Sequence, residues 1–149
     1  MRESDVPGLL RLVGTVFAEF GCVLRAELDE PHLLDPGRFF RPGGGEFWVT
    51  PPFGPILGTV AVKLHRGGAA ELKCLYVHPG CRGAGWGRAL TELALAHARR
   101  AGRRRIVLWS DTRFLAAHAL YRRLGFEQAG LRPLHDSNRS WEYGFSRRL

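Results

Sequence analysis

The sequence predicts a single α/β domain over residues 1–149, with a mixed, mostly antiparallel central sheet flanked by helices. Three apolar, β-branched segments joined by short Gly- and Pro-containing turns between residues 46 and 77 are typical of an antiparallel meander. The order strand, helix, strand from residue 71 to residue 109 requires a crossover, which makes the sheet mixed. A chain of 149 residues can bury one sizeable core.

The first element predicted is an amphipathic helix over residues 5–20. Ser4 and Asp5 can cap its start, and Pro7 suits the first turn. Apolar residues follow at helical spacing, and Gly21 can end the helix. No strand is expected before it.

Residues 22–45 contain three prolines and a run of three glycines, so only a short helix at 28–34 or 36–40 is expected there. The remaining chain carries clearer patterns. We predict strands at 46–50, 56–64 and 69–77, a helix at 86–101, a strand at 106–109, a helix at 112–124, and a last strand at 140–145 that follows residues 126–130.

Composition excludes several classes of protein. The hydrophobic fraction of 45% is ordinary for a globular chain, and no apolar run approaches the ~18 residues of a membrane span. The N-terminal residues lack the layout of a signal peptide, which favours a cytoplasmic protein. Three cysteines are an odd number without metal-type spacing, so we expect no metal site. No base that could activate Cys81 is evident, so we expect a structural role for it.

The most informative stretch is a Gly-rich turn between the strand ending at Val77 and the helix beginning near Trp86. Unpaired backbone N–H groups and the positive end of a helix dipole make such a turn an anion site. Arg82 and Arg88 add positive charge that suits phosphate. The turn matches neither the Rossmann fingerprint nor the P-loop, because position 88 is Arg and no Lys follows the glycines.

Two motifs in this chain resemble the GNAT superfamily of N-acetyltransferases. Arg82, Gly85 and Gly87 form R-x-x-G-x-G, which resembles the family's acyl-CoA pyrophosphate loop, and residues 117–126 resemble its second signature, A-x-x-x-Y-x-x-x-G-F. The resemblance implies acetyl-CoA as cosubstrate and transfer of its acetyl group to a primary amine by direct attack. The cofactor-binding residues that it implies are Leu75, Tyr76, Val77, Arg82, Gly83, Ala84, Gly85, Trp86, Gly87 and Arg88.

The same resemblance supplies the catalytic candidates. Tyr121 is the candidate general acid for the leaving thiolate, and a backbone N–H of Leu75 or Val77 would stabilise the oxyanion. Glu71 is the candidate general base, because its spacing from Arg82 matches the catalytic Glu of histone-acetylating members. A chain of waters is the alternative base, and the histidines His65, His78 and His118 are others.

One residue departs from the family pattern. Where relatives often carry Asn, seven residues before Tyr121, this chain has Phe114. A side-chain hydrogen bond to the pantetheine arm would then be missing, unless Ser110 or Asp111 replaces it.

Two rival functions remain open at the level of sequence. One is an acyl-CoA-binding module without turnover. The other follows from the net charge of +8 and the arginine run at 99–105, which suit nucleic acid or an acidic partner.

The acceptor is not specified: a small amine and a protein or peptide amine both fit, and the positive charge favours one that bears a carboxylate. A homodimer through the C-terminal strands is compatible with the sequence.

Overall fold

The computed structural model describes residues 1–149, whose six strands form one sheet in the order β1-β2-β3-β4-β6-β5. All neighbouring strands are antiparallel except β3 and β4, so the predicted mixed, mostly antiparallel sheet is confirmed. The strands are β1 (Glu46–Thr50), β2 (Gly58–Leu64), β3 (Ala69–Val77), β4 (Arg105–Asp111), β5 (Glu127–Pro133) and β6 (Trp141–Arg148).

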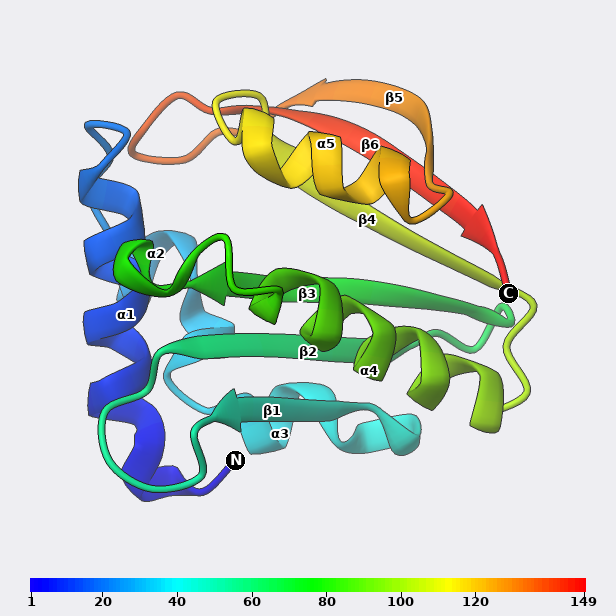
Figure 1. Cartoon of the computed structure of the whole chain (residues 1–149), viewed down its shortest axis with the longest axis horizontal. Helices are drawn as coiled ribbons and strands as arrows, with labels where there is room; N and C mark the ends of the chain where they lie inside the picture. Colours follow the sequence, from blue (N-terminus) through cyan, green and yellow to red (C-terminus); the bar gives the residue numbers. More distant parts are fainter.

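Helices cover both faces of the sheet (Figure 1). The long helix α4 and the shorter α5 lie on one face, and α1 with the short helices α2 and α3 on the other. Their bounds are α1 (Val6–Ala18), α2 (Ala26–Asp29), α3 (Pro36–Phe40), α4 (Trp86–Arg100) and α5 (Leu115–Arg123). Single 3-10 turns lie at Glu3–Asp5, Pro31–Leu33, Pro42–Gly44 and Pro79–Cys81.

Each face of the sheet has its own core because side chains alternate along a strand. On β2, Val60 and Val62 face α4 and α5, whereas Ala61 between them faces α1 and α3. Leu108 and Phe145 extend the first core across β4 and β6. Apolar side chains of the strands are therefore buried on both faces of the sheet.

The parallel pair β3–β4 is incomplete. Its register covers only Ala69–Glu71 against Arg105–Val107. Beyond Glu71 the two strands diverge, and the widening is visible between β3 and β4 in Figure 1. A bulge lies on β3 a few residues after Glu71, because the register with β2 shifts between Thr59 and Ala61 and Cys74 has a positive φ of 53°. Such bulges bend a strand and end its pairing.

Several predicted boundaries were wrong. The helix expected at 112–124 begins only at Leu115, because β4 continues to Asp111 and Thr112 N donates to Trp141 O. The last strand runs to Arg148 rather than to residue 145, since β6 pairs with β4 along its whole length. The irregular segment 22–45 contains four short helical pieces, which are α2, α3 and the 3-10 turns at Pro31–Leu33 and Pro42–Gly44. Of these, α3 coincides with the short helix expected at 36–40.

Before α1, residues 1–5 contain one 3-10 turn at Glu3–Asp5. None of the helices combines the length and the apolar character that a membrane span requires.

Replacing a side chain of the core under α5 should be costly. Leu108 on β4 is 1% exposed, whereas Leu131 on β5 is 56% exposed. We expect Leu108→Ala to lower the free energy of unfolding by about 2–5 kcal/mol, because it removes buried surface and leaves a cavity. Leu131→Ala should change it by less than about 0.5 kcal/mol. Urea denaturation of both variants measures the difference, and equal losses would contradict the assignment of the core.

Candidate functional site

The Gly-rich turn has the geometry of an anion site. Gly83 and Gly85 adopt positive φ angles of 81° and 84°, and α4 begins directly afterwards at Trp86. None of the backbone N–H groups from Gly83 to Arg88 has an acceptor within the chain. Nothing lies within 4 Å of where a Cβ atom on Gly83 or Gly85 would be. The turn therefore offers free donors and open space at the positive end of a helix.

The two arginines that flank this turn carry carboxylate partners. Arg82 donates to both carboxylate oxygens of Glu19, at 3.1 and 2.6 Å, and so connects the turn to the end of α1. Arg88 Nε donates to Glu92 Oε1 at 2.8 Å within α4. Both pairs are solvent-exposed, so each contributes little to stability and a phosphate group can compete for the guanidinium.

A cleft of about 610 Å³ extends from the turn along the free edge of β3. His78 N donates to Leu57 O on the β2 side, and successive strand amides alternate in direction. The amides of Val77 and Leu75 therefore point away from β2, toward the gap that β4 leaves. The cleft is lined by Val16, Phe20, Leu75, Tyr76, Val77, Arg82, Gly83, Gly85, Trp86, Gly87, Arg88, Arg113, Phe114, Leu115, Ala116, Ala117, Leu120 and Arg123.

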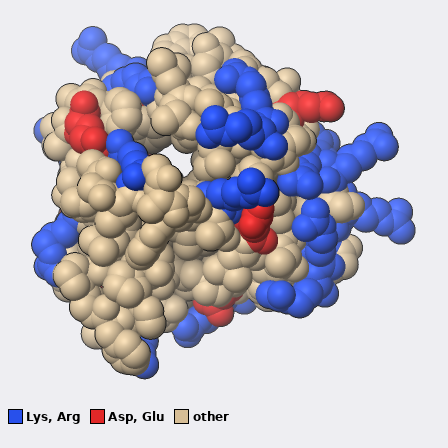
Figure 2. Space-filling model, viewed as in Figure 1, with Lys and Arg blue, Asp and Glu red and all other residues tan.

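A second, smaller cavity of about 100 Å³ adjoins the cleft. In the orientation of Figure 1, Figure 2 shows an opening that passes through the molecule beside α5, with Lys and Arg side chains at its rim. The two cavities share a boundary at the point where β3 and β4 diverge. The residues that line both are Leu75, Tyr76, Arg113, Phe114 and Ala117.

Tyr121 on α5 lines the smaller cavity. Its ring packs against Phe126 and Phe145, and the residue is only 4% exposed. Its hydroxyl has no hydrogen-bond partner in the chain, and burial raises the pKa of this phenol well above its usual range. The hydroxyl is therefore a neutral, uncommitted donor at a cavity wall.

Glu71, the predicted base, lines neither cavity. It belongs to the short paired part of β3, where its carboxylate oxygens lie 2.9 Å from His65 Nε2 and 3.6 Å from Lys73 Nζ. The structure thus separates Glu71 from Tyr121, with His65 beside it.

The other two histidines weighed as bases also lie outside both cavities. His118 is 2% exposed, and its Nε2 lies 3.0 Å from the carbonyl oxygen of Asp111. His78 Nδ1 accepts from Gly80 N just before the Gly-rich turn.

The smaller cavity contains a carboxylate that sequence reasoning missed. Glu30 lies just after α2, and its Oε2 is 3.2 Å from His32 Nε2, which is also 3.2 Å from the Cys74 thiol. Burial raises the pKa of Glu30 to about 7 and lowers that of His32 to about 4. The segment 22–45 has no periodic pattern, so its side chains could not be assigned to a surface or a cavity.

Phe114, at the position where relatives often carry Asn, has apolar neighbours in the structure. Phe114 packs against Phe20 and Phe17, with ring centroids 4.8 and 6.5 Å apart. Ser110 and Asp111, which could replace the hydrogen bond of that Asn, line the smaller cavity rather than the cleft. Although burial acts to raise the pKa of Asp111, hydrogen bonds from Arg113 hold it below its usual range.

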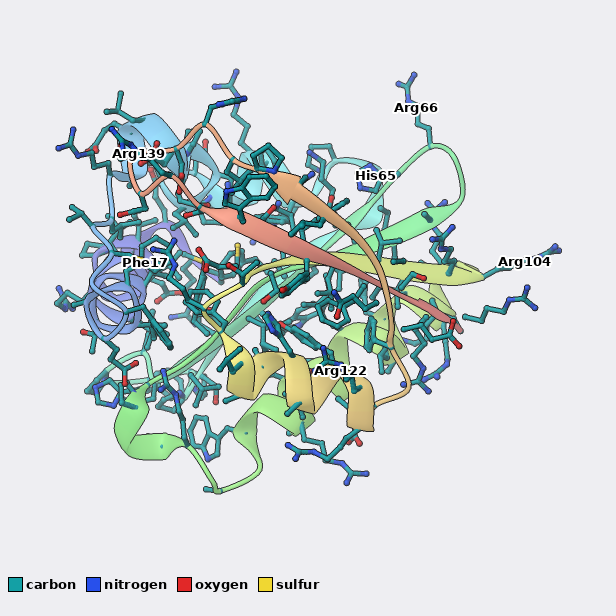
Figure 3. All side chains as sticks on the ribbon, turned by 90° about the horizontal axis from the view of Figure 1, so that it is seen from above. Phe17, His65, Arg66, Arg104, Arg122 and Arg139 are labelled. Carbon is teal, nitrogen blue, oxygen red and sulfur yellow. The ribbon has the colours of Figure 1, made fainter.

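None of the arginines in the run at 99–105 lines either cavity. Figure 3 shows Arg66 and Arg104 extending from the end of the molecule opposite α1, the helix that carries Phe17. Phe17 lines the smaller cavity. Basic charge thus gathers both at the Gly-rich turn and at the far end of the sheet.

Comparison with known proteins accounts for this architecture. Residues 16–126 match the acetyltransferase (GNAT) family. The chain belongs to this family. The match includes the Gly-rich turn, the diverging strands and α5, so the GNAT resemblance of the sequence motifs is confirmed.

Two curated relatives illustrate the similarity. A mycothiol acetyltransferase of Cellulomonas flavigena is 35% identical over 72% of this chain but only 31% of its own length, so the chain spans about a third of that protein. An uncharacterized N-acetyltransferase of Escherichia coli, YjgM, is 30% identical over 83% of this chain and 77% of its own length.

Two solved GNAT-fold structures share the whole architecture. An acetyltransferase of the GNAT family from Staphylococcus aureus Mu50 covers 100% of this chain and 96% of its own, with a TM-score of 0.88 and 20% identity. The other is the yncA protein of Salmonella typhimurium, solved with its cofactor acetyl-CoA. The match covers 100% of this chain and 91% of that chain, with a TM-score of 0.77 and 19% identity. At these identities the likeness shows the fold.

The raised pKa of Glu30 predicts a pH-dependent stability. The folded state favours the protonated carboxyl, so this contribution is present below the ordinary pKa of about 4.5 and is lost as the pH rises through about 7. Glu30→Gln stays neutral and avoids the loss. We expect this variant to be more stable than the wild type at pH 8, by about 1–3 kcal/mol, and equal to it at pH 4.

Urea denaturation at both pH values measures this difference. Glu127→Gln on β5 is a matched control, because Glu127 is exposed and without an ion-pair partner. A stability gain of Glu30→Gln that is the same at pH 4 and pH 8 would contradict the burial of an ionised Glu30.

Proposed function

We propose that this protein is an N-acetyltransferase that transfers the acetyl group of acetyl-CoA to a primary amine by direct attack. The observation that carries the proposal is the continuous path from the Gly-rich turn, along the free edge of β3, to the smaller cavity at Tyr121. Membership of the acetyltransferase (GNAT) family supports it, and so does the acetyl-CoA bound to a neighbour of the same fold.

The turn would hold the pyrophosphate of CoA. Its free N–H groups suit several phosphate oxygens at once, and Arg82 and Arg88 would add charge after leaving their carboxylate partners. The remaining residues proposed for this contact are Gly83, Ala84, Gly85, Trp86 and Gly87, all at the junction of turn and helix.

The pantetheine arm would pair with β3. Its amides resemble a peptide, so it can add to the free edge beside Leu75, Tyr76 and Val77 as an extra strand. This pairing would satisfy backbone groups that the divergence of β4 leaves open. One of these amides, of Leu75 or Val77, would then donate to the oxyanion of the tetrahedral intermediate.

Tyr121 would act as the general acid. Its hydroxyl is protonated at any working pH and has no competing partner, so it can donate to the sulfur as the C–S bond breaks. A non-catalytic acyl-CoA-binding module would not need such a donor. The rival nucleic-acid function would use the distal arginines and leave the path to Tyr121 without a purpose.

The general base proposed from the sequence is Glu71. Its contacts with His65 and Lys73 and its place outside both cavities weaken this assignment. A homodimer through the C-terminal strands would leave the path unchanged, because neither β5 nor the end of β6 lines the cleft.

A thermal shift with acetyl-CoA tests the binding site. We expect acetyl-CoA and free CoA each to raise the melting temperature of the wild type, because a ligand that binds only the folded state stabilises it. Gly85→Glu should lose the shift, since it adds a negative charge to the turn at a position with φ of 84°. Gly67→Glu, in the β2–β3 turn with open space around it, is the matched control and should keep the shift. A wild type without any shift would refute the proposed cofactor.

Replacing Tyr121 with Phe tests the chemical step. The variant keeps the packing of the ring against Phe126 and Phe145 but lacks the donor. We expect kcat for thiol release to fall by about 10²- to 10⁴-fold, with little change in the acetyl-CoA thermal shift. An unchanged kcat would show that the thiolate leaves without help from Tyr121.

A further inference from the structure

The smaller cavity is enclosed by segments that contact one another, and it is not only an indentation of the surface. Tyr121 is 4% exposed, and its unpartnered hydroxyl is at the cavity wall. The β5–β6 loop closes one side, since the amide of Asn138 exchanges hydrogen bonds with the backbone of Val23, each 2.9 Å long. Segments far apart in sequence are thus fixed around one space.

Among the charged residues that line this space, carboxylates outnumber cations, although the whole chain has a net charge of +8. Four carboxylates face two cations there. The carboxylates belong to Glu30, Asp111, Asp136 and Glu142, and the cations to Lys73 and Arg113.

Both cations are already paired. Arg113 donates to Asp111 Oδ2 at 2.5 Å and to Ser140 Oγ at 2.6 Å. Lys73 Nζ lies 3.6 Å from Glu71. A ligand carboxylate would therefore enter among like charges without a free cation to receive it.

Three of the carboxylates are likewise engaged. Asp111 pairs with Arg113, Glu142 accepts from Arg132 at 2.7 Å, and Asp136 accepts from the backbone and hydroxyl of Ser140. The only side chain within ion-pair distance of Glu30 is His32, at 3.2 Å, an imidazole that burial keeps neutral. Glu30 is thus the carboxylate that can accept a proton from an incoming group.

We propose that the smaller cavity is the acceptor site, that it takes a primary amine without a carboxylate of its own, and that Glu30 is the base that removes the proton from this amine. The inference rests on the proposed acetyltransferase function and deepens it. The net positive charge favoured an acceptor that bears a carboxylate. The inference reverses this expectation, because the carboxylates of the cavity would lie closer to the acceptor than the distal arginines.

Glu30 takes a proton from the ammonium, and the nitrogen lone pair then forms a C–N bond to the acetyl carbon, whose carbonyl electrons move to oxygen. When the carbonyl re-forms, the C–S bond breaks and Tyr121 protonates the leaving thiolate. The second proton of the attacking nitrogen restores the phenol, and Glu30 later releases its proton to solvent.

The pKa of Glu30 agrees with this role. A value of about 7 leaves the carboxylate ionised at slightly alkaline pH and basic enough to accept a proton. The charged and titratable groups around it are Asp29 and His32 on its own segment, Lys73, Cys74 and Tyr76 on β3, Asp136 in the β5–β6 loop and Glu142 on β6.

Matched pairs of amines test the acceptor class. One member of each pair lacks a carboxylate and the other carries one, as in 1,5-diaminopentane and 5-aminopentanoate, with thiol release from acetyl-CoA as the readout. We expect kcat/KM to favour the member without a carboxylate by about tenfold or more. Equal values, or a preference for the carboxylate-bearing members, would overturn the proposal.

Three substitutions test the base. Glu30→Gln should lower kcat by about 10²-fold or more and abolish the rise of kcat/KM with pH around pH 7. Glu127→Gln should behave as the wild type. Loss of activity in Glu71→Gln together with a wild-type rate in Glu30→Gln would overturn the proposal and return the role to Glu71.

The acetyl-CoA thermal shift distinguishes a failure of the acceptor site from a failure of the proposed acetyltransferase function. Each variant should keep this shift, which shows that it is folded and binds the cosubstrate. If the wild type shifts but acetylates neither member of any pair, the acceptor inference is wrong while the binding site stands. If the wild type shows no shift and no turnover, the proposed function falls together with the inference.

Discussion

The incomplete pairing of β3 with β4 is the constraint on which the rest of the structure depends. Only Ala69–Glu71 of β3 bond to β4, although both strands continue for several residues. Buried backbone N–H and C=O groups are costly when they have no partner, so an interior gap of this kind is stable only if water or a ligand completes it. The gap creates the cleft and the smaller cavity, and α5 and the Gly-rich turn border it.

The gap lies between a positively charged surface and a cavity with an excess of carboxylates. On one side, free backbone amides and arginines form a positive surface at the start of α4. On the other side, Glu30 and its neighbours give the smaller cavity an excess of carboxylates. Because short-range fields in a partly buried site exceed those of distant, solvent-screened charges, the net charge of +8 says little about which acceptor fits.

Much of the fold could be predicted because its signals are local. The turn at residues 82–87 follows a strand and precedes a helix in sequence, and β1 and β3 were predicted with their observed bounds. The helix α5 was predicted three residues too long at its start, since Ser110 and Asp111 look like a helix cap. Their pairing with β6 kept them in β4 instead, which is a long-range effect that no local pattern reveals.

The sequence by itself determined the class of fold, the GNAT motifs and the place of Tyr121 on its helix, because each depends on residues that are neighbours along the chain. Only the tertiary structure decided which carboxylate reaches the smaller cavity. Glu71 looked suitable by spacing, but its place in the paired part of β3 directs it to His65 and Lys73. Glu30 belongs to an aperiodic segment, and the packing of that segment against β3 and the β5–β6 loop brings it to the cavity. Such contacts join residues more than forty positions apart, and their geometry exists only once the sheet has formed.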